Sequence, residues 1–316
     1  MSVKDDENMS RLTIQSLQRK RRQVQMRSWE FAKLQSKLPS TVCVDVGASY
    51  YPHTSWWFFL DVPTVNWIAV EPNSQNMSYV ANWAWNSKIE YISTGLSQFG
   101  GLQTLFVTNV DSGSSLLQPV IPKSMKHRLG EDGEKYFFPV HEIEVETLTL
   151  ESLFNRFPNV PRIIKLDTQG SELAILKNVF EGKDSPHVIG IEIECSLLAT
   201  PLYQNSPRLW EVAEYLEAYG FELLFLDVFP RSNVAKKISR NPREVVNECD
   251  AMFALRRDIV VELSLESRLT LFGFYITNSF YKEAIWLLED DSDIKTWLVS
   301  QELSLQDLLK LLNKRL

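Results

Sequence analysis

The stretch that most constrains the fold is residues 162–172, RIIKLDTQGSE, in which a short apolar run leads into a helix. Residues 163–166 predict a buried strand, and Gly170 predicts the turn into the helical run that follows. A strand followed directly by a helix is half of a βαβ unit. Ligands of open parallel sheets bind outside the carboxyl ends of the strands, so we expect Asp167 and Glu172 beside a site. The alternative, that Asp167 only caps the helix, stays open at this point.

Two earlier segments have the same character. Residues 41–49, TVCVDVGAS, form a nearly continuous apolar run, which is typical of a parallel strand covered on both faces, and the run ends at Asp45 and Gly47. Residues 67–73, WIAVEPN, form a second such run that ends at Glu71. In nucleotide-binding sheets, an acidic residue about 20 positions beyond the glycine turn binds the ribose hydroxyls, and we expect this of Glu71.

These three segments in this order resemble the FkbM-type methyltransferases, which use S-adenosylmethionine (SAM). The match includes their K-x-D-x-x-G-x-E pattern at Lys165, Asp167, Gly170 and Glu172, and the resemblance covers residues 42–257. It implies an α/β fold with a doubly wound, Rossmann-like SAM-methyltransferase sheet. It also implies O-methylation of a hydroxyl on a sugar, glycan or polyketide-like acceptor.

The resemblance further implies which residues bind the cofactor. They come from the ends of the first two strands and from the segment after a third predicted strand, residues 89–92. Gly47 lets the backbone approach the nucleoside because it has no Cβ. The expected SAM-binding residues are Asp45, Gly47, Ala48, Ser49, Glu71, Pro72, Asn73, Ser93, Thr94 and Ser97.

One departure from the family affects the choice of function. The family usually continues GAN-x-G after the first strand, whereas here Gly47 is followed by Ala-Ser-Tyr-Tyr-Pro, and the chain has no G-x-G-x-x-G. A dinucleotide pyrophosphate needs those glycines, and SAM carries no phosphate, so the departure argues mainly against an NAD-linked oxidoreductase. It leaves a second hypothesis, a non-catalytic binding protein on a degenerate methyltransferase scaffold.

Carboxylates at neighbouring strand ends are the candidate catalytic groups. A further apolar strand carries Glu192 and Glu194, two residues apart and therefore on one face. Together with Asp167 and Glu172 they would repel one another near the transferred methyl group. A divalent cation such as Mg²⁺, held by Asp167, Glu192 and Glu194, would relieve this and lower the pKa of the acceptor hydroxyl. Alternatively, one carboxylate or His53 acts as a metal-free general base, or Glu192 and Glu194 only pair with lysines or backbone amides.

Three other segments carry weaker signals. Residues 96–102 predict a hairpin turn that returns as a strand at 104–107. The polar cluster at 111–116, DSGSSL, is either a wall on the substrate side or an ordinary loop. Residues 140–145 alternate and predict a strand with His141 on its polar face.

Charge and periodicity divide the chain into three parts: residues 1–40, 41–258 and 259–316. The first is a basic helical arm with nine Lys or Arg against four acids, either a solvated helix or a contact for an anionic partner. The last lacks strand-like alternation and predicts three or four helices, whose leucine stripe packs on the sheet domain or on a second copy of the chain. The second alternative would make the protein a homo-oligomer that assembles through these helices.

Composition excludes several classes of protein. A net charge of −7 gives no electrostatic pattern typical of general nucleic-acid binding. The partner that the resemblance implies is a small-molecule or glycan acceptor. No apolar run reaches 18 residues, the length needed for a membrane span. The first ten residues lack the apolar core of a secretory signal. The three cysteines are widely spaced and odd in number, which fits neither a metal site nor a disulfide framework. We therefore expect a cytoplasmic protein.

Overall fold

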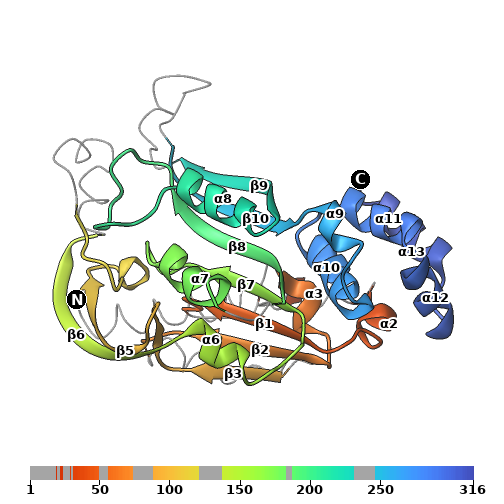
Figure 1. The fold of residues 1–316 in the computed structure, drawn as a ribbon, viewed down its shortest axis with the longest axis horizontal. Coiled ribbons are helices and arrows are strands. Elements are labelled where there is room, and N and C mark those ends of the chain that lie inside the picture. Colours follow the sequence, from red (N-terminus) through yellow and green to blue (C-terminus); the bar gives the residue numbers. More distant parts are fainter. Residues whose placement is uncertain are drawn as a thin grey trace.

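The computed structural model describes residues 19, 22, 23, 29, 31–49, 56–73, 88–120, 137–182, 187–230 and 246–316. Its central layer is a seven-stranded sheet in the order β3-β2-β1-β7-β8-β10-β9 (Figure 1). The strands are β1 (Thr41–Val46), β2 (Val65–Val70), β3 (Lys88–Ile92), β7 (Arg162–Leu166), β8 (Val188–Ser196), β9 (Phe221–Pro230) and β10 (Val246–Leu255).

The sheet is doubly wound, as predicted. The first five strands in this order pair in parallel, and β10 pairs antiparallel with both β8 and β9. The chain runs from β1 outward to β2 and β3, and later returns to β7 on the other side of β1. The strand order therefore reverses between β1 and β7, the point at which such sheets bind ligands.

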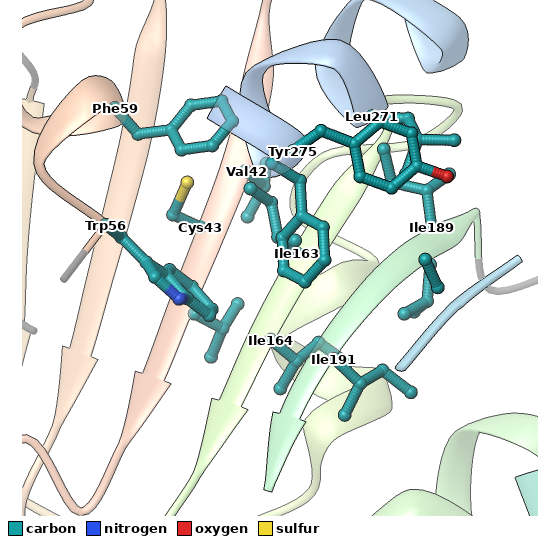
Figure 2. Packing of buried hydrophobic residues seen from close by; sticks show 14 of the residues in the cluster. Val42, Cys43, Trp56, Phe59, Ile163, Ile164, Ile189, Ile191, Leu271 and Tyr275 are labelled. Atoms are coloured by element: carbon teal, nitrogen blue, oxygen red, sulfur yellow. The ribbon is translucent and has the colours of Figure 1, made fainter. Parts of the chain in front are cut away.

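One face of the sheet is covered by α3 (Trp57–Leu60) and α10 (Leu265–Thr277). The β1–β7 register pairs Cys43 with Ile163, so both side chains point to this face. Figure 2 shows Phe59 of α3 and Tyr275 of α10 over the strands that carry them. A Cβ on Gly273 of α10 would come within 2.6 Å of the Phe59 ring, so the glycine is what lets the two helices meet.

The other face is covered by α6 (Leu150–Phe154), α7 (Glu172–Phe180) and α8 (Leu209–Ala218) (Figure 1). The ring of Phe180 packs edge-on against Tyr215 of α8 and Phe221 of β9, at 6.5 and 5.6 Å between centroids. With both faces covered, all six residues of β1 are buried, which explains why its sequence is a continuous apolar run.

A second, smaller sheet has the order β4-β6-β5. It consists of β4 (Gly95–Leu96), β5 (Gly101–Thr108) and β6 (Pro139–Leu148), and the 3₁₀ turn Asp111–Gly113 follows β5. The prediction that residues 96–102 form a hairpin turn returning at 104–107 is wrong. The strands β4 and β5 do not pair with each other, because β6 lies between them and pairs with both. The ten-residue β6 offers β5 a far longer ladder than the two-residue β4 does.

The described chain ends in helices, as predicted for residues 259–316. They are α9 (Arg257–Val260), α10, α11 (Tyr281–Asp290), α12 (Ser292–Ser300) and α13 (Leu305–Asn313). One hydrophobic cluster includes residues of β1, β7 and α10, so the core continues across position 258. The proposed division of the chain there remains a prediction.

The predicted N-terminal helix lies largely outside the described residues. Its last part, α2 (Ala32–Gln35), follows Phe31, whose ring lies 5.7 Å from that of Trp57. The Arg315 guanidinium lies 5.4 Å from the Phe31 ring, so the two ends of the described chain meet here. In the part of the chain that the structure describes, no helix is long and apolar enough to cross a membrane.

Candidate active site

A cavity of about 580 Å³ lies at the carboxyl ends of β1, β2 and β7, beside the reversal of strand order. The loops after these strands form one part of its wall, and β4, β5, β6 and the segment after β5 form the rest. Its lining residues are Val46, Gly47, Ser49, Val70, Glu71, Pro72, Asn73, Thr94, Gly95, Leu96, Leu105, Val107, Asp111, Ser112, Ser114, Ser115, Leu116, His141, Ile143, Asp167, Thr168, Gln169 and Ser171.

Glu71 stands at the end of β2 and lines this cavity, as the sequence predicted. One of its carboxylate oxygens accepts a hydrogen bond from the Ser49 N–H at 3.0 Å, and the other accepts one from the Asn73 N–H at 2.8 Å. Burial, joined by the charges of Asp111 and Asp167, raises the pKa of Glu71, although these two amide bonds oppose the rise. A carboxylate has about four acceptor positions, so Glu71 retains capacity for hydroxyl groups of a ligand.

The turn after β1 depends on Gly47, which lines the cavity. A Cβ at this position would lie 1.9 Å from the carbonyl oxygen of Asp167, and Gly47 has a φ of +78°. The glycine therefore permits close approach of the β1 and β7 ends to each other. Ser49 also has a positive φ, 48°, in the left-handed region where the asparagine usual in the family is better tolerated.

Two of the predicted site residues, Asp45 and Glu192, are not among the residues that line the cavity. Asp45 is 1% exposed, and its carboxylate lies 3.9 Å from the Lys165 ammonium. Glu192 is 2% exposed and accepts a hydrogen bond of 2.6 Å from Trp56 Nε1. The register pairs Lys165 with both residues, so all three side chains point to the face beneath α3 and α10.

The carboxylate of Asp167 does line the cavity, and its side chain is 38% exposed. It accepts hydrogen bonds from Lys165 Nζ and from Gln169 Nε2, both at 3.1 Å. Burial by itself would raise the pKa of Asp167, but Lys165, Glu194 and Gln169 outweigh it and hold the pKa below its ordinary value. Asp167 is therefore an ionised acceptor at neutral pH.

Glu172 and Glu194 lie behind the cavity wall. Glu172 accepts hydrogen bonds from the backbone N–H groups of Thr168 and Gly170 at 2.8 and 2.9 Å, so it holds the loop after β7 in shape. Burial raises the pKa of Glu172 to about 7. Burial and the charge of Asp167 raise the pKa of Glu194, which accepts a hydrogen bond from the Gln169 side chain.

The structure does not assemble the predicted metal ligands. Asp167 faces the cavity, whereas Glu192 bonds to Trp56 on the covered face of the sheet. Among the described residues, no three His, Cys, Asp or Glu side chains form a group suited to a metal ion. The other predicted catalytic residue, His53, lies outside the described part of the chain.

The polar cluster at 111–116 proves to be part of the cavity wall. The Asn73 side-chain amide donates to Asp111 Oδ2 at 2.9 Å, and Ser115 Oγ donates to the Gln169 carbonyl oxygen at 2.8 Å. The hydroxyl of Tyr203 lies 2.8 Å from both the Gln169 side-chain oxygen and the Gly113 carbonyl. These contacts fasten the segment after β5 to the loop after β7, and Gln169 holds a left-handed φ of 58° between them.

The remaining predicted cofactor residues divide into two groups. Pro72, Asn73 and Thr94 line the cavity, whereas Ala48, Ser93 and Ser97 do not. The hydroxyl of Ser97 lies 2.8 Å from that of Thr147 and accepts from the Gly100 N–H, so Ser97 supports the small sheet.

Four lining residues of β5 and β6 were absent from the predicted site. The register pairs Val107 with His141 and Leu105 with Ile143, which brings all four side chains to one face of the small sheet. That face lines the cavity. The alternation of residues 140–145 predicts the strand and its two faces, but only pairing with β5 decides which face meets the site.

Comparisons with known proteins agree with the sequence resemblance. A family model, the FkbM methyltransferase domain, matches residues 45–223. No curated protein matches the sequence.

Solved structures resemble the chain only distantly. A precorrin-6y C5,15-methyltransferase from Geobacter metallireducens GS-15 is 13% identical over 71% of this chain and 86% of that one, with a TM-score of 0.30. A 1,6-didemethyltoxoflavin-N1-methyltransferase from Burkholderia thailandensis, with bound 1,6-didemethyltoxoflavin and S-adenosylhomocysteine, is 12% identical over 81% and 92%, with a TM-score of 0.28. A SAM-dependent methyltransferase from Anabaena variabilis is 9% identical over 69% and 77%, with a TM-score of 0.31.

Proposed function

The chain belongs to the FkbM methyltransferase family, and from this premise we propose that it transfers the methyl group of SAM to a hydroxyl oxygen of a small-molecule or glycan acceptor. The main support for the proposal is the position of Glu71, which follows β2 and lines a cavity at the point where the strand order reverses. A volume of about 580 Å³ lies within the range of small-molecule and cofactor sites, about 300–1,000 Å³.

The residues of the cavity fit this cofactor. The spare acceptor positions of Glu71 suit the two ribose hydroxyls, and Leu96 and Leu116 offer an apolar surface to the purine ring. Three carboxylates, those of Glu71, Asp111 and Asp167, line the same cavity and favour a positively charged ligand. When bound, SAM supplies a methyl group on a cationic sulfur, which is electrophilic.

The protein has two tasks in such a transfer. It must align the acceptor oxygen with the methyl carbon, and it must remove the hydroxyl proton. The segment 111–116 and the loop after β7 are fastened together by Ser115 and Tyr203, so this wall of the cavity is held in a fixed position. A wall held in this way suits the alignment of the acceptor oxygen with the methyl carbon, because the alignment is lost when the groups that bind the acceptor move.

Calorimetry with SAM, S-adenosylhomocysteine and NAD tests the cofactor. We expect the two sulfur compounds to bind and NAD not to bind, and binding of NAD alone would refute the proposal. Incubation with methyl-labelled SAM and a metabolite extract, followed by mass spectrometry, then tests transfer. Repeating it after exhaustive chelation, and again with added Mg²⁺, decides whether a divalent cation activates the acceptor hydroxyl.

The missing second glycine favours a second candidate, a protein that binds SAM without transferring its methyl group. Ser49 has a φ of 48°, and the sequence that follows it lacks the family's second glycine. This candidate predicts a normal dissociation constant for SAM together with no labelled product from any extract. Labelled product above the protein-free control would eliminate it.

A further inference from the structure

His141 is a cavity residue to which nothing so far assigns a role. It lies on β6, and its cross-strand partner is Val107. Both residues line the cavity, together with Ile143 two positions further along β6. The imidazole is exposed, and within the described residues it makes no hydrogen bond. His141 therefore presents a free ring to the same space as Glu71.

The other titratable groups of the described lining are already engaged. Glu71 accepts two backbone amide bonds, and Asp111 accepts from the side chain of Asn73. Asp167 pairs with Lys165, and this contact lowers its pKa, which makes it a weak base. A general base works best when its pKa is near the working pH, and histidine is the side chain whose ordinary pKa lies closest to neutral.

We propose that His141 is the general base of the transfer, an inference that rests on the function proposed above. The acceptor oxygen forms a bond to the methyl carbon, and the carbon–sulfur bond breaks with its electron pair remaining on sulfur. The hydroxyl proton moves to the unprotonated ring nitrogen of His141. The products are the methyl ether, S-adenosylhomocysteine and an imidazolium ion, which then releases its proton to water.

The surroundings of His141 suit this step. The charged groups that face the same cavity are the carboxylates of Glu71, Asp111 and Asp167, and the ammonium of Lys165 lies behind Asp167. The adjacent Glu142 points to the opposite face of β6. The imidazolium formed in the step is therefore stabilised by carboxylates across the cavity.

Nuclear magnetic resonance of the imidazole groups tests the placement without an acceptor. A base close to the transferred methyl group lies close to the cationic sulfur of SAM, whereas sulfur in S-adenosylhomocysteine is neutral. We expect the pKa of His141 to be lower in the SAM complex than in the S-adenosylhomocysteine complex by about 1 unit or more. The chain has four histidines, and the signal of His141 is identified by its loss in His141→Gln.

His187 is the internal control, because it precedes β8 at the amino-terminal edge of the sheet, opposite the cavity. Its pKa should be the same in both complexes. Equal pKa values for His141 in two complexes whose formation calorimetry has verified would overturn this inference and leave the proposed function standing. Failure of both compounds to bind would overturn the proposed function and this inference with it.

Kinetics give a second test once the labelling experiment has identified an acceptor. The His141→Gln enzyme should lose about 10²- to 10⁴-fold in kcat, with little change in the dissociation constant for SAM. Its rate should also lose the rise with pH that titration of a histidine base produces, whereas His187→Asn should keep both. A His141→Gln enzyme with the wild-type rate and pH profile would refute the role.

Discussion

Replacement of Glu71 by alanine or glutamine measures the role of this carboxylate in cofactor binding. The carboxylate accepts the Ser49 and Asn73 N–H groups at 3.0 and 2.8 Å, and its remaining acceptor positions face the cavity. Hydrogen bonds to a charged group contribute about 1.5–3 kcal/mol, so Glu71→Ala should raise the dissociation constant of SAM about 10- to 150-fold.

The glutamine variant makes the test more specific, because glutamine has nearly the same size and shape as glutamate but carries no charge. The Ser49 and Asn73 N–H groups bond to different oxygens of the carboxylate, and the amide of glutamine has an acceptor oxygen at only one of these two positions, so one of the N–H groups loses its acceptor. The amide nitrogen then faces a donor, and the turn after β1 should loosen. We expect Glu71→Gln to weaken SAM binding nearly as much as Glu71→Ala, which a loss of packing alone would not produce.

Isothermal calorimetry with SAM and S-adenosylhomocysteine measures both variants. The matched control is Glu90→Ala, because Glu90 lies on the neighbouring strand β3 and pairs with Arg156 on the surface, at 2.6 Å. The control should bind as the wild type does. A Glu71→Ala protein with native near-ultraviolet circular dichroism and a dissociation constant within about twofold of wild type would refute the assignment.

Four further predictions concern stability, measured by urea or thermal unfolding. Gly47→Ala should cost more than about 2 kcal/mol, because its Cβ would overlap the Asp167 carbonyl and strain a positive φ; a neutral effect would contradict the close approach. Ser49→Asn should stabilise by about 0.5–1 kcal/mol, because Asn tolerates the left-handed region better; a loss of stability would show that its φ is not strained. Glu172 has a pKa raised to about 7, so the folded protein binds its proton more tightly than the unfolded chain does, and the resulting stability, present below about pH 4.5, is lost as pH rises through 7. Glu172→Gln should therefore exceed wild type by about 2–4 kcal/mol at pH 8 and match it near pH 4.5, and equal stability at both pH values would be the contrary result. A chain that ends at residue 258 should lose cooperative unfolding, whereas one that ends at 280 keeps α10 and should unfold cooperatively at a lower temperature; cooperative unfolding of the shorter chain would show that the sheet stands without α10.

Much of the fold could be predicted because parallel strands buried on both faces must be continuous apolar runs, as in residues 41–46 and 162–166. Because such runs do not alternate between apolar and polar residues, the sequence does not show to which face of the sheet each side chain points. Asp45 and Glu192 stand near strand ends and read as site residues, but only the β1–β7–β8 register shows that they lie beneath α3 and α10. There the Lys165 ammonium lies 3.9 Å from the Asp45 carboxylate, and Trp56 Nε1 donates a hydrogen bond to Glu192. The sequence alone does not distinguish buried acids with such partners from catalytic ones.

The rest of the site depends on contacts between segments far apart in the chain. Pairing of Val107 with His141 brings β6 across the cavity, and no local pattern in either segment predicts that pairing. The turn residues around Gly100 favoured a hairpin in which β4 and β5 pair directly. Instead β5 pairs with β6, with which it forms more backbone hydrogen bonds than the two-residue β4 could offer. The position of Glu71 at the cavity could be predicted from the sequence, because it depends on a strand end alone.

The dependence of the sheet on α10 has a consequence for how the protein is made. Gly190 of β8 has no Cβ, and one placed there would lie 2.9 Å from the ring of Phe274, so this part of the sheet is shaped to receive the helix. Protein chains are synthesised from the amino terminus, and the strands leave the ribosome before residues 265–277 do. Until then the surface beneath α10, including Ile163, faces water or a chaperone. A premature stop codon after β10 would thus leave a sheet with one apolar face uncovered, a product suited to degradation or aggregation rather than to partial activity.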